Sequence, residues 1–409
     1  MVHSTGTLVP EGQNRNTRIP RKTVPRQEVV MKMRNERALL VGLAFVLPLA
    51  MCVAVRADRD DHLRPYRLLS TISIPGNLAG GFDVSWVDSE AGRYYLADRG
   101  TTSIDVIDTK HDTFLYAIPL QAAGNGVVAI HKSNDDDADE KGPAELWVGD
   151  AQSFVEVVDL KTKAVSLPKI PTNGNGRADE LAYDPQHHIV LVANDRDTPT
   201  PFVSFIDTKT RTNLGRLLYP QVVFGTPPRG HGIEQPVWDS KTRRFYIAIP
   251  ATSAHPNGEV DELDAVMTST GFGVVTNVFQ TTCSPAGLVL VPGQLLVTSC
   301  GDVISIKTGA IHHVAGFGGD EIWFNPGDER VYFGGGLDRI SVPVLDTDTN
   351  TLVTTLTVGH IFPLPPPPQP PNQTTHSVAA DRENNRIFVP VRNVGVRVYT
   401  DARAGHDDD

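Results

Sequence analysis

The sequence has few cysteines, no excess of positive charge and none of the common catalytic signatures. Its 3 cysteines in 409 residues are too few for a disulfide-built scaffold, and they lack zinc-finger and haem-attachment spacing. Residues 58–409 carry 28 basic and 45 acidic residues, a formal charge of −17. Such a surface repels phosphate groups, so we expect neither nucleic acid nor membrane headgroups as partners and favour a cationic or neutral small molecule. A GxSxG nucleophile motif and a phosphate-binding loop are also absent.

Long apolar runs are equally scarce, because the sequence has a single one at 38–55. Basic residues precede it, Pro48 interrupts it, and small residues flank Arg56 at its end. We therefore interpret residues 31–57 as a secretory signal peptide and expect a periplasmic or secreted protein, with no membrane contact beyond that signal. A membrane anchor and a lipoprotein modified at Cys52 are the alternatives. Residues 1–30 are expected to be a disordered or non-native extension.

Two cysteines remain after the predicted signal, Cys283 and Cys300. They flank two apolar segments joined by a Pro292-Gly293 turn, so a hairpin would bring them face to face within a small register error. In an exported chain this arrangement favours one disulfide bond. Two free buried cysteines are the alternative.

A short pattern recurs along the chain: an apolar strand that ends in Asp, followed by Thr with Lys or Asn, and then another strand. Four clear copies and three degenerate ones begin at residues 103, 154, 202, 341, 259, 302 and 395. Their spacing of about forty to sixty residues is typical of one four-stranded propeller blade. The Asp carboxylate can accept hydrogen bonds from backbone N–H groups two residues on, which stabilises the turn.

A second hairpin precedes each copy, and its following strand is apolar throughout, as in 189–194 and 244–249. Such strands are buried on both faces. The seventh unit lacks an outer strand, and residues 67–74 resemble the missing one. We therefore predict an all-β fold, a seven-bladed β-propeller of four-stranded antiparallel blades over residues 66–401, closed by an N-terminal strand that completes the last blade. Residues 402–409 would be an acidic tail.

The segment LVANDRDTPTPFVSFIDTKTRTNLGRL, which begins at Leu191, resembles the YVTN β-propeller repeat. The likeness extends over about 66–401, and is weakest in the fourth and fifth units. It implies the propeller fold and a periplasmic or surface location. It does not imply one activity, because propellers serve as lactonases, oxidoreductases and binding proteins.

Aligning the units on the residue that opens the first hairpin turn places ionisable residues in register. Five positions before that residue stand Asp83, Asp179, Glu234, Asp320 and His376. We expect them at one mouth of the central channel, where neighbouring carboxylates need a cation or a proton. They are our candidate metal ligands. Calcium is the ion we favour, with magnesium, manganese, zinc and iron left open.

The next position carries Glu180 and Glu321, which together with His376 are the candidate catalytic residues. In a metal-dependent hydrolase of lactonase type, a carboxylate would serve as general base beside a metal-bound water. The alternative is purely structural: the acids cap turns or pair with Arg99, Arg339 and Arg392. These arginines and His231, in the loop 227–232, are also the candidate ligand-binding residues.

Three classes of function remain open. The preferred one is an exported propeller that binds a small ligand or a divalent cation at the acidic channel mouth. The second is the lactonase- or esterase-type hydrolase at the same site, so whether the protein is an enzyme is not decided. The third is a platform for a protein partner, using the proline-rich segment 362–371.

Overall fold

The computed structural model describes residues 66–131, 143–223, 232–362 and 370–401. All of them belong to the second of two compact units, Ala57–Asp409. The predicted extension at 1–30, the signal peptide at 31–57 and the tail at 402–409 lie outside the described residues. These three assignments stay predictions.

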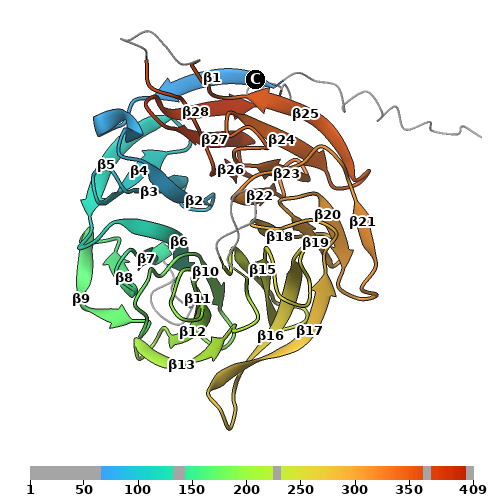
Figure 1. The fold of residues 1–409 in the computed structure, drawn as a ribbon. Helices are drawn as coiled ribbons and strands as arrows, with labels where there is room; N and C mark the ends of the chain where they lie inside the picture. The colour runs from blue at the N-terminus through green and yellow to red at the C-terminus, as the bar shows by residue number, and fades with distance from the viewer. Residues whose placement is uncertain (1–65, 132–142, 224–231, 363–369, 402–409) are drawn as a thin grey trace, which may run out of the picture. The chain divides into compact units, whose positions relative to one another are not determined.

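Seven four-stranded antiparallel sheets form the blades of a β-propeller, arranged around a central channel (Figure 1). The innermost strands are β2 (Phe82–Asp88), β6 (Gly124–His131), β10 (Leu181–Asp184), β14 (Pro236–Asp239), β18 (Leu288–Val291), β22 (Ile322–Asn325) and β26 (Ala379–Asp381). The second strands are β3 (Arg93–Asp98), β7 (Pro143–Asp150), β11 (Ile189–Asn194), β15 (Arg244–Ile249), β19 (Leu295–Thr298), β23 (Arg330–Phe333) and β27 (Arg386–Val391).

The third strands are β4 (Ser103–Asp108), β8 (Phe154–Asp159), β12 (Phe202–Asp207), β16 (Glu259–Met267), β20 (Asp302–Ser305), β24 (Ser341–Asp346) and β28 (Gly395–Thr400). The outer strands are β5 (Thr113–Pro119), β9 (Ala164–Pro171), β13 (Thr212–Leu218), β17 (Phe272–Gln280), β21 (Ile311–His313), β25 (Thr351–Thr357) and β1 (Arg67–Ile72). A short 3₁₀ turn, η2 (Pro75–Leu78), follows β1. The predicted fold class is confirmed.

The repeated Asp closes the turn after the third strand in the way the sequence predicts. Asp108 Oδ1 accepts hydrogen bonds from the backbone N of Lys110 at 3.0 Å and of His111 at 2.9 Å. Asp207 and Asp346 make the same kind of turn. These contacts satisfy backbone N–H groups at the hairpin, so one short sequence pattern produces the same hairpin in successive blades.

The ring closes through β1, which pairs antiparallel with β28 and so joins the N-terminal strand to the last blade. Arg67 lies opposite Thr400, and Ile72 lies opposite Val396. This pairing covers what would otherwise be an open edge strand, where another chain could add.

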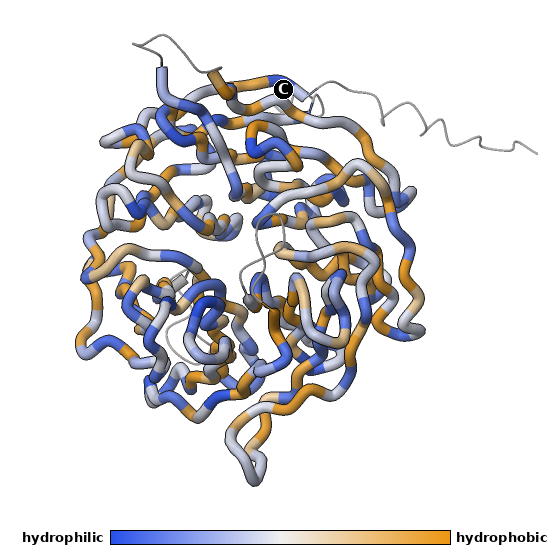
Figure 2. The backbone as a smooth tube through the Cα atoms, viewed as in Figure 1, coloured by the Kyte–Doolittle hydropathy of each residue, from blue (hydrophilic) through white to orange (hydrophobic). Residues whose placement is uncertain are grey.

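The apolar core is divided among the seven interfaces between adjacent blades. One buried cluster joins Leu191 and Phe205 of the third blade to Phe245 and Leu263 of the fourth. Six further clusters occupy the other interfaces. Figure 2 shows apolar residues spread through all the blades. Since strands such as β11 are buried along their whole length, the non-alternating sequence pattern is explained.

A disulfide bond joins Cys283 and Cys300, as predicted. The cysteines lie just beyond the ends of the β18–β19 hairpin. Its register pairs Leu288 with Thr298, so the bond links the loop before β18 to the turn after β19. The described residues contain no helix that is both long and apolar enough to cross a membrane.

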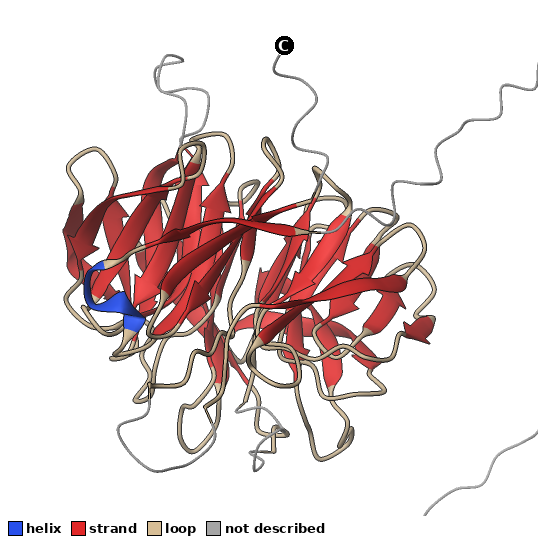
Figure 3. Cartoon of the chain, turned by 90° about the horizontal axis from the view of Figure 1, so that it is seen from above, coloured by secondary structure: helices blue, strands red, loops and turns tan. Residues whose placement is uncertain are grey.

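Every blade repeats the same up-and-down strand order, and the connecting loops gather on two opposite faces (Figure 3). The residues that immediately precede the innermost strands therefore all lie at the same end of the channel. This repetition is what positions the candidate site.

Candidate functional site

The predicted acidic residues do gather at one end of the channel. Burial raises the pKa of Glu321, and so do the charges of Asp320, Asp83 and Glu234, which act on it from the same end of the channel. His376 Nε2 lies 3.2 Å from Asp83 Oδ1. The residues brought together are Asp83, Asp179, Glu180, Glu234, Asp320, Glu321 and His376.

Asp83 is held by a buried polar network. Arg99 donates to its carboxylate and also to Asn125 Oδ1, at 3.1 Å from Nε. The His376 ring stacks on Phe82 at 4.7 Å between centroids, which orients it toward Asp83. Burial opposes ionisation, but the hydrogen bond from His376 and the charge of Arg99 outweigh it and lower the pKa of Asp83.

Arg177 is the centre of a second network at this mouth. It forms an ion pair with Asp179 and a fork of two 2.9 Å hydrogen bonds with Asp195, and it lies 3.8 Å from Asp83. Asp195 is fully buried. Burial and the charge of Asp195 raise the pKa of Asp179, whereas the guanidinium favours its anion. Arg177 therefore compensates several carboxylates at once.

Guanidinium groups thus occupy the position beside Asp83 and Asp179 that the sequence assigned to a divalent ion. The five predicted metal ligands do not bring three ligand atoms within 4.8 Å of one another. A metal bound by Asp83 or Asp179 would compete with these arginines for the carboxylates. The metal assignment stays a prediction.

The other predicted basic residues have different positions. Arg392 donates to the carbonyl of Ala79, at 3.2 and 3.1 Å, and not to the acids. Arg339 is exposed on the loop between β23 and β24. His231 lies outside the described residues. Among the predicted basic partners that the structure describes, Arg99 is the one that contacts an acid of the channel mouth, Asp83.

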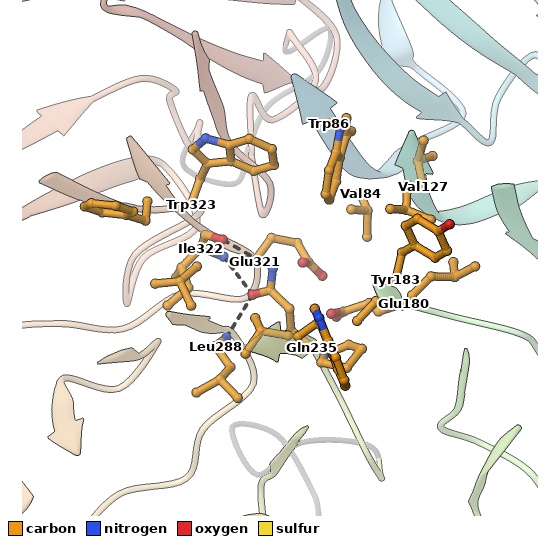
Figure 4. A pocket seen from close by; sticks show the side chains of 18 of the residues that line it. Val84, Trp86, Val127, Glu180, Tyr183, Gln235, Leu288, Glu321, Ile322 and Trp323 are labelled. Atoms are coloured by element: carbon orange, nitrogen blue, oxygen red, sulfur yellow. Dashed lines mark hydrogen bonds between the residues drawn. The ribbon is translucent and has the colours of Figure 1, made fainter. Parts of the chain in front are cut away.

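The residues one position after the mouth acids, among them Glu180, Gln235 and Glu321, line a cavity of about 500 Å³ in the channel (Figure 4). Its polar lining comes from Glu180, Glu321 and Gln235, together with the hydroxyl groups of Ser85 and Tyr183. The remaining walls are aliphatic and aromatic, with Trp86, Val127, Tyr183, Val237, Trp238, Leu288, Ile322 and Trp323 among them. A largely apolar cavity of this size with a few polar groups is typical of small-molecule sites.

Glu180 and Glu321 are the unusual groups in this cavity. Each is only 5% exposed, and Oε2 of each has no hydrogen-bond partner. Figure 4 shows both carboxyl groups pointing into the cavity. Burial and the charge of Glu321 raise the pKa of Glu180 well above its usual range. Burial also raises the pKa of Glu321, although a hydrogen bond with Glu180 opposes this. Two such acids share one proton more readily than they both carry a negative charge.

The neutral residues at the same register position have structural partners. Gln235 Oε1 accepts from the backbone N of Leu288 at 2.9 Å and of Ile322 at 3.3 Å, which ties three blades together. Ser377 Oγ bonds to the N and Oγ of Ser85, both at 3.0 Å. These contacts leave Glu180 and Glu321 as the ionisable groups with unused hydrogen-bonding capacity in the cavity.

Two tryptophans of the cavity wall form an aromatic pair. The rings of Trp86 and Trp323 meet edge to face, with centroids 5.2 Å apart and planes at 86°. Between their blades, β26 carries Ala379 and Ala380, which leave room for the two rings. Both tryptophans also line a second cavity of about 290 Å³ beyond the pair.

Sequence reasoning missed Arg177 and these aromatic walls. Arg177 stands seven positions before the turn-opening Asp184, where the other aligned units carry Gly81, Gly232, Gly318 and Thr374. No repeated signal marks it. The tryptophans stand within apolar strands and look like ordinary core residues. Only their place on the innermost strands distinguishes them.

Comparison with known proteins supports the fold and goes no further. No protein-family model matches the chain, and no curated protein is similar to it. Its structure is similar to hydrazine synthase of Kuenenia stuttgartiensis, with a TM-score of 0.57 and 13% sequence identity over 79% of this chain and 95% of that one. At this identity the likeness is evidence for the fold alone. The seven-bladed propeller is confirmed, and the YVTN resemblance stays a prediction.

Proposed function

We propose that the propeller binds a small organic molecule with one positive charge inside the central channel. The observation that carries this proposal is the pair of buried carboxyl groups of Glu180 and Glu321 in a largely apolar cavity, since Oε2 of each has no hydrogen-bond partner. A buried polar group without a partner is costly, so a ligand that supplies hydrogen-bond donors there is favoured.

The charge of the ligand follows from the pair. Burial and the charges of neighbouring acids raise the pKa values of Glu180 and Glu321, which favours one proton shared by the two carboxyl groups, and a pair that shares one proton carries one negative charge. A monocation compensates that charge. The acidic surface of the chain also attracts cations and repels anions.

The body of the ligand would contact the aromatic wall. Trp86, Trp238 and Trp323 present large ring surfaces to the cavity. Aromatic rings bind aliphatic and aromatic groups, and their faces attract ammonium ions. An amine on a hydrophobic ring or chain satisfies both parts of the site.

We place the protein outside the cytoplasm, in the periplasm or the medium. The predicted signal at 31–57 supports this location, and so does the disulfide, because disulfides persist in oxidising compartments. The metal-dependent hydrolase stays a prediction. It is less well supported, because arginines already compensate Asp83 and Asp179.

Phenethylamine and phenethyl alcohol are a matched pair of probes that differ in charge. Three of the four tryptophans of the chain line the cavity, so intrinsic fluorescence reports occupancy. We expect the amine to bind more tightly than the alcohol. Glu321→Gln should weaken amine binding by about tenfold or more, which corresponds to about 1.4 kcal/mol.

Glu329→Gln is the matched control, because Glu329 is an exposed glutamate in the same blade as Glu321. It should leave the affinity unchanged. Equal affinities for amine and alcohol, or an unchanged affinity in both Glu180→Gln and Glu321→Gln, would contradict the proposal.

A further inference from the structure

A second group of metal-binding side chains lies in the fifth blade, far along the chain from the acids of the mouth. Cys283 Sγ, a carboxylate oxygen of Asp302 and a ring nitrogen of His313 all lie within 4.8 Å of one another. Cys300 adds a second sulfur, because it is bonded to Cys283. Two cysteines, one histidine and one aspartate are the number and types of ligand that a tetrahedral zinc ion takes.

The strands of the blade hold these ligands in place. Asp302 begins β20 and His313 ends β21, and the two residues lie directly opposite each other in the antiparallel register. His313 Nδ1 is 2.8 Å from Asp302 Oδ1. One short pair of strands thus fixes Asp302 and His313, and Cys300 lies in the turn two residues before Asp302. Little ordering is left for a metal to impose.

Thr282 orients the aspartate from the other side. Its backbone N donates to Asp302 Oδ2 and its Oγ1 donates to Oδ1, both at 2.6 Å. Asp302 is fully buried, whereas the His313 side chain is 44% exposed. The carboxylate is thus held by outer hydrogen bonds as in established zinc sites, and the histidine leaves a path for the ion to enter.

We propose that this cluster is a zinc site that opens when the disulfide is reduced. In the disulfide form the sulfurs are poor ligands, which leaves Asp302 and His313 alone. Reduction supplies two thiols whose deprotonated sulfurs are strong zinc ligands, so the set becomes Cys283, Cys300, Asp302 and His313. The site does not depend on the channel or its ligand.

The chemistry balances with an ordinary thiol or phosphine reductant. A phosphine takes the oxygen of one water molecule and becomes a phosphine oxide, while its electron pair and the two hydrogens of water convert the disulfide to two thiols. Zinc then displaces the two thiol protons, and neutral His313 coordinates through Nδ1. In reverse, a disulfide oxidant accepts the two electrons as it becomes two thiols, the Cys283–Cys300 bond forms again, and zinc is released.

The test uses the full chain with Cys52→Ser, so that these two thiols are the only ones present. One portion stays in the disulfide form, and the other is reduced with a phosphine. Both are incubated with zinc chloride and desalted, and their zinc content is measured. We expect one zinc per chain in the reduced form and none in the disulfide form. Cobalt in place of zinc should give a thiolate charge-transfer band and the strong visible bands of a tetrahedral site.

His312 is the control for His313, because it is the neighbouring histidine on the same strand, β21. His313→Gln should weaken zinc binding by about tenfold or more, as loss of a ligand contact does, and His312→Gln should leave it unchanged. Equal effects of the two substitutions would overturn the proposal. So would zinc retained equally by both redox forms, or a reduced chain that keeps its circular dichroism spectrum and binds no zinc.

A third variant avoids chemical reduction. Cys300→Ser leaves Cys283, Asp302 and His313 as a permanent three-residue set. It should bind zinc more weakly than the reduced parent, but at least about tenfold more tightly than the same variant carrying His313→Gln. Equal binding by these two variants overturns the proposal even if the reduced parent unfolds.

Discussion

Asp83 and Asp179 at the channel mouth differ from Glu180 and Glu321 inside the cavity, although one residue separates Asp179 from Glu180. The mouth acids are satisfied: Arg99, Arg177 and His376 contact them. The inner acids each keep a buried oxygen without a partner. Successive residues of an extended segment point in opposite directions, so Asp179 and Glu180 meet different surroundings although they are adjacent in the chain.

This difference separates structural from functional acids. A carboxylate between guanidinium groups has its charge compensated within the protein and needs no ligand. A carboxyl group in an apolar cavity is compensated only by a proton or by something that enters. The acidic residues of the sequence therefore indicate which end of the channel to consider. Whether each acid has a basic partner in the structure then indicates which acids are available to a ligand.

The largest effect should come from removing Arg177, on which the mouth depends. Arg177→Met leaves Asp83, Asp179 and Asp195 together with one cation fewer, and breaking such a buried pair costs about 3 kcal/mol or more. Urea unfolding measures the loss. Arg392→Met is the control, because Arg392 contacts only a carbonyl from an exposed position; a surface change of this kind should stay within about 0.5 kcal/mol. Similar losses in the two variants would show that the mouth network is not structural.

Asp83→Asn and Glu180→Gln compare the two regions directly with the same chemical change. We expect Asp83→Asn to cost about 2 kcal/mol, because it weakens hydrogen bonds to Arg99 and His376 that involve charge. Glu180→Gln should leave stability unchanged or raise it at pH 8, since it removes a buried acid that has no cation beside it. Urea midpoints at pH 8 give both values. A larger loss in Glu180→Gln than in Asp83→Asn would reverse our assignment of the two regions.

Ser377→Ala tests a neutral residue at the same register position as Glu321. It removes the hydrogen bonds to Ser85 that join the first and last blades, and we expect a loss of about 1 kcal/mol. Amine binding should be unaffected. If fluorescence titration shows a loss of binding as large as that of Glu321→Gln, the polar contact of the ligand is not specific to the acid pair.

The smallest expected effect is a pH dependence specific to the inner acids. Their pKa values in the folded protein lie above the ordinary 4.5, so the unfolded chain releases these protons first as the pH rises. Relative to the double variant Glu180→Gln/Glu321→Gln, the wild type should be most stable below pH 4.5 and should lose stability as the pH rises above it. Melting temperatures from pH 4 to 8 measure the difference.

That comparison isolates the pair from other buried acids. Burial and the charge of Asp98 raise the pKa of Asp105 to about 7, and burial and the charge of Glu259 raise that of Asp261 to about 8. Both contribute equally to wild type and variant, so they cancel in the difference. Parallel curves for wild type and variant would show that Glu180 and Glu321 titrate normally.

The sequence by itself determined the architecture. A recurrent strand that ends in Asp, the apolar strands between the turns and the spare strand at 67–74 were enough to predict seven blades and their closure, because these features act locally and repeat. The two cysteines were predicted to pair for the same kind of reason, since a short hairpin brings them together. The register also predicted that acids from several blades would meet at one mouth.

Only the tertiary structure decided which of those acids have partners. No other aligned unit carries an arginine at the position of Arg177, and its contacts to Asp83 and Asp195 reach another blade and another loop. The cluster of Cys283, Asp302 and His313 was not predicted either. Asp302 and His313 come together through the register of β20 and β21, and the loop before β18 brings Cys283 to them. A repeat specifies the backbone, whereas the compensation of a buried charge depends on whichever unique side chain happens to reach it.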